Sequence, residues 1–175
     1  MYKFLNRLWR QVHDLCGKAG DETLFAQKPA DEAAVAAAKK LVRERHRVVE
    51  KVSADIERNN FNTAIAAIME LANATGDFLH AASAEERAEN AELKALSADI
   101  AEVLVKLLSP ICPHWSEELW HTVLGHEGSV HVEPWPEFDP EKAKADEVEL
   151  AVQVNGKVKA KITVAADAAE EDVKA

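Results

Sequence analysis

Cysteine is scarce in this sequence: the 175 residues include only Cys16 and Cys112, which lie far apart and form no CxxC motif. This scarcity excludes a disulfide framework and a zinc site built on paired cysteines. A secretory segment is also missing from the start of the chain. We therefore expect both cysteines to be reduced thiols in a cytoplasmic protein.

Long apolar runs and glycine are also in short supply. Charged residues interrupt the apolar stretches every few positions, which excludes a membrane-spanning segment. There are only six glycines, alanine is common, and the hydrophobic content of 47% is enough for a core. This composition favours helix, and the length predicts one ordinary domain, alone or with a small appendage.

Positive charge is in deficit, because the formal net charge is -10. Domains that bind nucleic acid through their overall field are usually basic, so the composition argues against that mode of binding. It does not exclude a local basic stripe.

Catalytic motifs are missing as well: there is no glycine-rich phosphate loop, no nucleophile elbow and no Cys/His cluster, so no catalytic or cofactor site is expected. Two acid-x-x-His spacings, Asp77 with His80 and Glu118 with His121, match those of di-iron helical bundles. Such ligands must project into the core. A count of about 100° per residue turns Asp77 and His121 away from the apolar faces of their helices, so no metal site is predicted.

What the sequence does contain is helical periodicity over residues 1–125, which predicts a mainly α fold, an antiparallel bundle of four to five helices. The first helix, 1–17, has an apolar face of four residues, and the second, 31–58, has a core line at seven-residue spacing. Residues 83–90 are either a loop or the first turns of the fourth helix. The first face is Phe4, Leu8, Val12 and Leu15, and the core line is Val35, Val42, Val49 and Ile56.

A sharp corner is predicted between the fourth and fifth helices. Pro110 lacks a backbone donor and biases Ser109 away from α geometry, so the fourth helix must end at Leu108. Pro113 suits the first position of a new helix, and two glutamates that follow it complement the positive end of the helix dipole. These glutamates are Glu117 and Glu118.

Two groups of basic residues are candidates for contact with phosphate. In the first helix, Lys3, Arg7 and Arg10 lie away from the apolar face with only Asp14 to offset them, as a solvated face or as a phosphate-contacting stripe. In the second helix, four cations lie about 100° to 180° from Val42 and form a basic ridge opposite the core. The basic ridge consists of Lys40, Arg43, Arg47 and Lys51.

Helical periodicity is lost over residues 126–146, which we call the strap and take as the linker after the bundle. Three prolines and Gly128 forbid helix there, while Trp135 and Phe138 are large enough to pin the strap to the bundle.

The period then changes to two, which predicts a β-hairpin from a truncated α+β domain over 147–175. A two-residue Asn155-Gly156 loop would bury lysines against valines, so we prefer a bulged three-residue turn that pairs Val152 with Val158 and Glu149 with Lys161. A helix then starts, with Asp167 and Glu170 at capping-box spacing. Alternate positions of the second strand carry three lysines, which are a second candidate patch or a plain solvated face. They are Lys157, Lys159 and Lys161.

Several stretches resemble a known family. Residues 4–10, 55–71, 107–120 and 133–136 look like the anticodon-binding helical bundle of class I aminoacyl-tRNA synthetases. Residues 152–162, Val-Gln-Val-Asn-Gly-Lys-Val-Lys-Ala-Lys-Ile, are similar to the opening of the C-terminal domain of bacterial leucyl-tRNA synthetases. The order of these matches favours the leucyl family over its isoleucyl, valyl and methionyl relatives.

The resemblance implies a piece of an ATP-dependent leucine–tRNA ligase that ends inside the C-terminal domain. The HIGH and KMSKS signatures are absent, so ATP and Mg would belong to a catalytic domain outside this chain, and the chain would have no cofactor of its own. The implied partners are tRNA(Leu) and the other domains of a monomeric synthetase. The tRNA would be contacted through its backbone and recognised by its shape. The alternative, from another class, is a helical scaffold whose basic ridge docks onto an acidic neighbouring domain.

Overall fold

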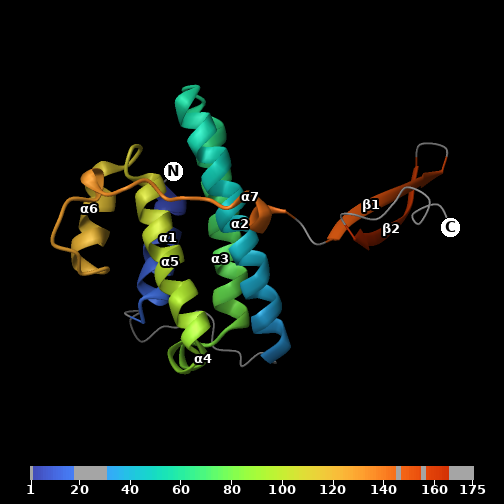
Figure 1. Ribbon diagram of the computed structural model, residues 1–175, viewed down its shortest axis with the longest axis horizontal. Coiled ribbons are helices and arrows are strands. Elements are labelled where there is room, and N and C mark those ends of the chain that lie inside the picture. The colour runs from blue at the N-terminus through green and yellow to red at the C-terminus, as the bar shows by residue number, and fades with distance from the viewer. Residues whose placement is uncertain (1, 18–30, 145–146, 155–156, 166–175) are drawn as a thin grey trace. The chain divides into compact units, whose positions relative to one another are not determined.

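The computed structural model describes residues 2–17, 31–144, 147–154 and 157–165. Within these residues the chain forms seven α-helices, one 3₁₀ helix and two strands (Figure 1). The predicted mainly helical fold is therefore confirmed. The chain divides into two compact units, Met1–Ala143 and Lys144–Ala175.

The first unit contains all of the helices that the structure describes. Two short ones, Val130–Val132 and Pro140–Ala143, lie within the strap, so the prediction that its prolines and glycine forbid helix is wrong; proline suits the first turn of a helix, and Pro140 begins one. Of the helices that the structure describes, none has both the length and the apolar composition that crossing a bilayer requires. In chain order they are α1 (Tyr2–Leu15), α2 (Asp31–Glu57), α3 (Phe61–Ala81), α4 (Ala84–Glu89), α5 (Ala91–Leu108), α6 (Pro113–Thr122), the 3₁₀ helix η1 (Val130–Val132) and α7 (Pro140–Ala143).

Helix α1 packs on α3 and α5 through the face that the sequence predicts. Phe4, Leu8, Val12 and Leu15 are all buried in the hydrophobic core. Helix α1 comes close to α3, as shown by the Nε2 of Gln11, which donates to the carbonyl of Ala72 at 2.9 Å. Gly76 makes this possible, since a Cβ there would lie only 3.2 Å from the same Nε2.

Helix α2 is rotated relative to the predicted core line. Leu41, Val48, Val49 and Val52 are fully buried and Ile56 packs against the core, whereas Val35 is 52% exposed and Val42 is only partly buried. The predicted core line is therefore right at Val49 and Ile56 and wrong at Val35 and Val42. Leu41 and Val42 are both apolar, so the spacing admits either one, and choosing the wrong neighbour turns the helix by about 100°.

The corner between α5 and α6 has the predicted ends but not the predicted cause. Pro113 occupies the first turn of α6, as expected. Ser109, however, has φ -56° and ψ -37°, which is right-handed α geometry, so Pro110 does not exclude it from that region. The first turn of α6 contains no acidic residue, so the predicted role of Glu117 and Glu118 at the helix dipole is also wrong.

Residues 83–90 form a helix of their own, α4, instead of a loop or the start of α5. A capping box, in which Ser83 and Glu86 satisfy each other's backbone N–H groups, begins it. Arg87 in this helix is buried and donates to the carbonyl of Ala82 at 2.9 Å and to Asp14 Oδ1 at 3.0 Å. This buried ion pair joins α4 to α1.

The second unit contains two antiparallel strands, β1 (Glu147–Val154) and β2 (Lys157–Ala165). Val152 lies opposite Ala160, but the next residue, Gln153, lies opposite Val158, so β2 carries one extra residue at Lys159. The predicted pairings are therefore wrong, and Glu149 and Lys161 face Thr163 and Ala151 instead. With the extra residue in the strand, Val148, Leu150 and Val152 lie opposite Val164, Ile162 and Ala160, whereas Val154 lies opposite Lys157. The Asn155-Gly156 turn and the predicted helix start at Asp167 and Glu170 lie outside the described residues.

Removal of the Arg87 guanidinium is expected to destabilise the first unit strongly. In Arg87→Met the carboxylate of Asp14 stays buried without its partner, so the free energy of unfolding should fall by about 3–5 kcal/mol. Urea unfolding of the variant measures the change. The double variant Asp14→Asn/Arg87→Met removes both charges and should regain part of the loss. A cost of under about 1 kcal/mol for the single change would contradict the buried pair.

Candidate nucleic-acid interface

The three predicted cations of α1 are exposed. Lys3, Arg7 and Arg10 lie on the surface, and among the described residues no carboxylate comes within ion-pair distance of them. The predicted offset by Asp14 is wrong, because that carboxylate is buried against Arg87. Arg7 instead lies over the ring of Phe4, at 5.8 Å from the centroid. We call Lys3, Arg7 and Arg10 the α1 stripe.

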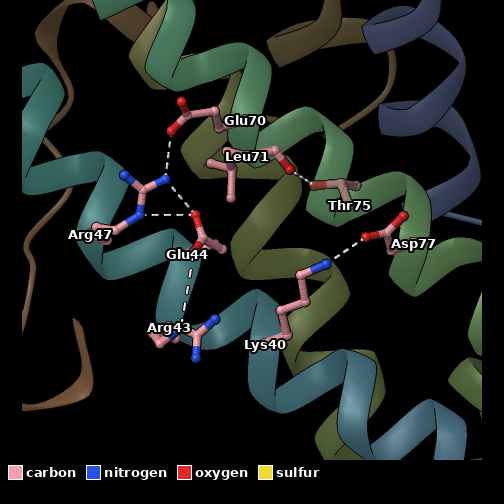
Figure 2. A network of polar contacts seen from close by, with 8 residues as sticks. All are labelled: Lys40, Arg43, Glu44, Arg47, Glu70, Leu71, Thr75 and Asp77. Atoms are coloured by element: carbon pink, nitrogen blue, oxygen red, sulfur yellow. Dashed lines mark hydrogen bonds and ion pairs between the residues drawn. The ribbon is translucent and has the colours of Figure 1, made fainter. Parts of the chain in front are cut away.

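The basic ridge of α2, in contrast, is largely paired with carboxylates (Figure 2). Lys40 Nζ lies 2.7 Å from Asp77 Oδ2 of α3, and Lys51 Nζ lies 3.1 Å from Asp55 Oδ2 within α2. Arg43 is the loosest member, since its Nε is 3.9 Å from the nearest carboxylate oxygen, on Glu44.

Arg47 is the most heavily engaged cation of the ridge. Its Nε and Nη2 donate to Glu44 Oε2 at 3.0 and 2.6 Å, and Nη2 also donates to Glu70 Oε2 of α3 at 2.6 Å (Figure 2). The hydrogen bond to Glu44 is the main cause of a raised pKa for Arg47, and the one to Glu70 adds to it. Both contacts favour the charged guanidinium.

The ridge lies on the side of α2 away from the core, as predicted, because its four cations are about 120° to 180° from the fully buried Val49. Counted at about 100° per residue from Leu41, Lys40, Arg47 and Lys51 lie about 80° to 120° around α2, on the side toward α3. Arg43 alone is about 160° away.

On its other side α2 holds the strap. Arg45 binds both carboxylate oxygens of Asp99 in α5, at 2.9 and 3.0 Å, and donates through Nη1 to the carbonyl of Glu137 in the strap. Trp135 Nε1 donates to Ser53 Oγ at 2.8 Å, so this tryptophan does fasten the strap to the bundle. The contacts are polar as well as apolar, which the sequence pattern does not indicate.

His46 completes the attachment of the strap. Its Nδ1 accepts the backbone N–H of Asp139 at 3.0 Å, which requires that the proton of the neutral ring is on Nε2. Burial and then the charges of Arg45 and Lys142 lower the pKa of His46, while Asp139 and Asp99 oppose the shift. His46 is thus a boundary histidine that holds the strap.

A sector of α2 faces neither α3 nor the strap. It contains Arg43 and also Lys39, which is exposed and belongs to no ion pair among the residues that the structure describes. Lys39 was not among the predicted site residues. Lys39 lies about 60° from Val42 but about 160° from Leu41. Taking Val42 as the core residue therefore hid the exposed position of Lys39.

The lysines of β2 lie at alternate positions along the strand, but they differ in how they pair with β1. Lys157 is opposite Val154 and Lys161 is opposite Ala151. Lys159 is the extra residue, so the alternation that would place all three on one face is interrupted there.

The sequence is similar to tRNA ligases along almost its whole length. Residues 38–174 match the family described as the anticodon-binding domain of tRNA ligase. A leucine–tRNA ligase of Geobacter sp. (strain M21) is 43% identical over 175 residues, covering 99% of this chain and 20% of that protein. One of Fervidobacterium nodosum is 40% identical and covers 98% of the chain and 20% of its own length. The chain therefore spans about a fifth of these relatives.

A solved structure is similar as well. It is the ternary complex of Agrobacterium radiobacter K84 agnB2 LeuRS with tRNA and LeuAMS, which matches with a TM-score of 0.66 and 31% identity. The match covers 98% of this chain and 20% of that one.

A fall in pH is expected to loosen the strap at Asp139. The protonated ring of His46 donates from both nitrogens and cannot accept this N–H. Because the folded-state pKa of His46 lies below its ordinary value of 6.5, the contact is intact above that value. Below pH 6.5 the histidine of the unfolded chain takes up a proton before that of the folded chain does, so stability is lost as the pH falls through the folded-state pKa. The hydrogen-exchange protection factor of the Asp139 amide measures the loss.

The matched control is His46→Asn, whose side-chain oxygen can accept the same N–H but does not titrate. Its protection factor should stay flat over the range in which the histidine protein loses protection. An equal pH dependence in both proteins would show that another group controls the strap.

Proposed function

Because the chain belongs to the anticodon-binding domain family of tRNA ligases, we propose that it is the tRNA-docking part of a leucine–tRNA ligase. In this role it holds tRNA(Leu) through the sugar-phosphate backbone and the shape of the molecule. The observation that supports the proposal most directly is the α1 stripe, where three exposed cations lack a carboxylate partner among the described residues. A polyanion is the chemical class that such a surface attracts.

The proposed contacts fall into three groups with different availability. The α1 stripe can bind phosphate directly, and so can Arg43, which Glu44 holds only loosely at 3.9 Å; Lys39 joins Arg43 on the same sector of α2. Lys40, Arg47 and Lys51 bind phosphate only if they leave, or share, their carboxylate partners. The lysines of β2 would add a third group in the second unit, which we take as the start of a C-terminal domain. These lysines are Lys157, Lys159 and Lys161.

Aminoacylation itself is assigned to the rest of the ligase. We propose that ATP, Mg and leucine bind outside the 20% of the relatives that this chain spans. The chain would then contribute tRNA affinity and no catalytic group, in a monomeric cytoplasmic enzyme whose other domains are its permanent neighbours.

The scaffold alternative would use the basic ridge to dock onto an acidic protein domain. It receives less support, since Lys40, Arg47 and Lys51 already have carboxylate partners within the bundle. Titration of the full-length ligase with tRNA(Leu) at low and high salt separates the two functions. Salt-sensitive binding supports tRNA docking, and no binding at either salt concentration would support the scaffold.

Reversal of charge on the α1 stripe is expected to weaken tRNA binding without affecting the chemistry of leucine activation. In Arg7→Glu/Arg10→Glu of the full-length ligase, each lost phosphate contact should reduce the salt dependence of binding by a little under one unit of slope. Leucine-dependent pyrophosphate exchange should keep its rate, because it needs no tRNA contact.

The control variant is Lys94→Glu, which makes the same kind of change at an exposed lysine of α5 that belongs to no ion pair among the described residues. It should lower the affinity much less per charge reversed. Equal losses per reversed charge would mean that tRNA senses only the overall field, and loss of pyrophosphate exchange would mean that the stripe is structural.

A further inference from the structure

The carboxylates that hold the basic ridge come from two sources, and they differ in exposure. Glu44 lies in α2, one turn from Arg47, and its side chain is 16% exposed. Glu70 and Asp77 lie in α3, and their side chains are 55% and 60% exposed. The α3 pair is therefore at the surface, where solvent and ions reach it.

A carboxylate and a phosphate make the same demand on arginine. Both accept two parallel N–H bonds from the guanidinium fork, so they compete for one face of the side chain. An exposed ion pair contributes only about 0–1 kcal/mol, because water and salt screen it. A phosphate held nearby by other contacts can therefore displace an exposed carboxylate.

The geometry of Arg47 shows which carboxylate can leave. Glu44 accepts from both Nε and Nη2, at 3.0 and 2.6 Å, while Glu70 accepts from Nη2 alone. Loss of Glu70 would leave the guanidinium still oriented by Glu44 and with one side of Nη2 available. Lys40 has a single partner, Asp77, and its ammonium turns freely on a flexible stem.

From these contacts we propose that Glu70 and Asp77 of α3 mask the basic ridge. They occupy Arg47 and Lys40 in the absence of RNA, and backbone phosphates of the bound tRNA replace them, while Glu44 keeps Arg47 oriented throughout. The proposal rests on the tRNA-docking function above and adds a mechanism to it. The α1 stripe and Arg43 make first contact, and the masked cations engage only when a phosphate is delivered to them.

Masking predicts that removal of an acidic residue improves tRNA binding by more than its charge alone explains. In the full-length ligase, Glu70→Ala should raise the affinity for tRNA(Leu) by about two- to fivefold, which corresponds to the contribution of one exposed ion pair. The matched control is Glu50→Ala, an exposed glutamate of α2 that belongs to no ion pair among the described residues. Its effect should be smaller, because it changes the field without freeing a cation.

A double-mutant cycle identifies Arg47 as the residue that is freed. Arg47→Gln should reduce affinity more in the Glu70→Ala background than in the unchanged ligase. The difference should equal, within error, the gain that Glu70→Ala produces when Arg47 is present. Urea unfolding of each variant checks that the bundle remains folded, and substitutions at such exposed positions should change its stability by about 1 kcal/mol at most.

Other outcomes would overturn the proposal. If Glu70→Ala lowers affinity, Glu70 positions the ridge and does not mask it. Equal gains in affinity for Glu70→Ala and Glu50→Ala would mean that overall charge explains the effect. Additive effects of Glu70→Ala and Arg47→Gln in the double-mutant cycle would mean that Arg47 is not the cation that Glu70 masks. In these cases tRNA docking would still stand if the unchanged ligase binds tRNA(Leu), whereas failure of the unchanged ligase to bind would remove both proposals.

Discussion

The rotation of α2 about its own axis determines most of what the surface of the bundle can do. Burial of Leu41, Val48, Val49 and Val52 sets that rotation, since these side chains are fully enclosed. Once it is set, one flank of α2 must face α3 and the other must face the strap. Arg47 is thereby brought to Glu70, and His46 to Asp139. A rotation by one residue would exchange these partners, so the polar contacts depend on the apolar ones.

The structure also shows that basic residues and accessible positive charge are different quantities. Arg87 is buried on Asp14, and Arg45 holds Asp99 together with the strap carbonyl of Glu137. Such arginines act as internal connectors, for which the guanidinium fork is better suited than an ammonium group. A charge count along the sequence treats them in the same way as Arg10, which has no such partner among the described residues. Only the set of contacts separates connectors from cations that can meet a ligand.

How well each element can be predicted from the sequence depends on how unambiguous its local pattern is. The apolar face of α1 was predictable, because only one helical stripe there is apolar, and the start of α6 was predictable, because Pro113 fits only the first turn. Helix α2 was predictable only in its second half, where Val49 and Ile56 reach the core, since Leu41 and Val42 are adjacent and a period cannot choose between them. The strand register failed for a related reason: one extra residue satisfies the pattern equally well in the turn or at Lys159. Paired site residues such as Glu70 were missed, because no local signal links α3 to α2.

The acidic residues of this protein act on its cations over two different distances. At physiological salt, charges separated by more than about 8 Å in solvent are largely screened from each other. Most of the acidic surface would therefore contribute little to the binding of a phosphate at the α1 stripe. Glu70 and Asp77 are different, since they touch the cations themselves at 2.6 and 2.7 Å and no solvent separates the charges. The formal net charge of -10 thus says little about affinity, and the few carboxylates in direct contact with the basic ridge say a great deal.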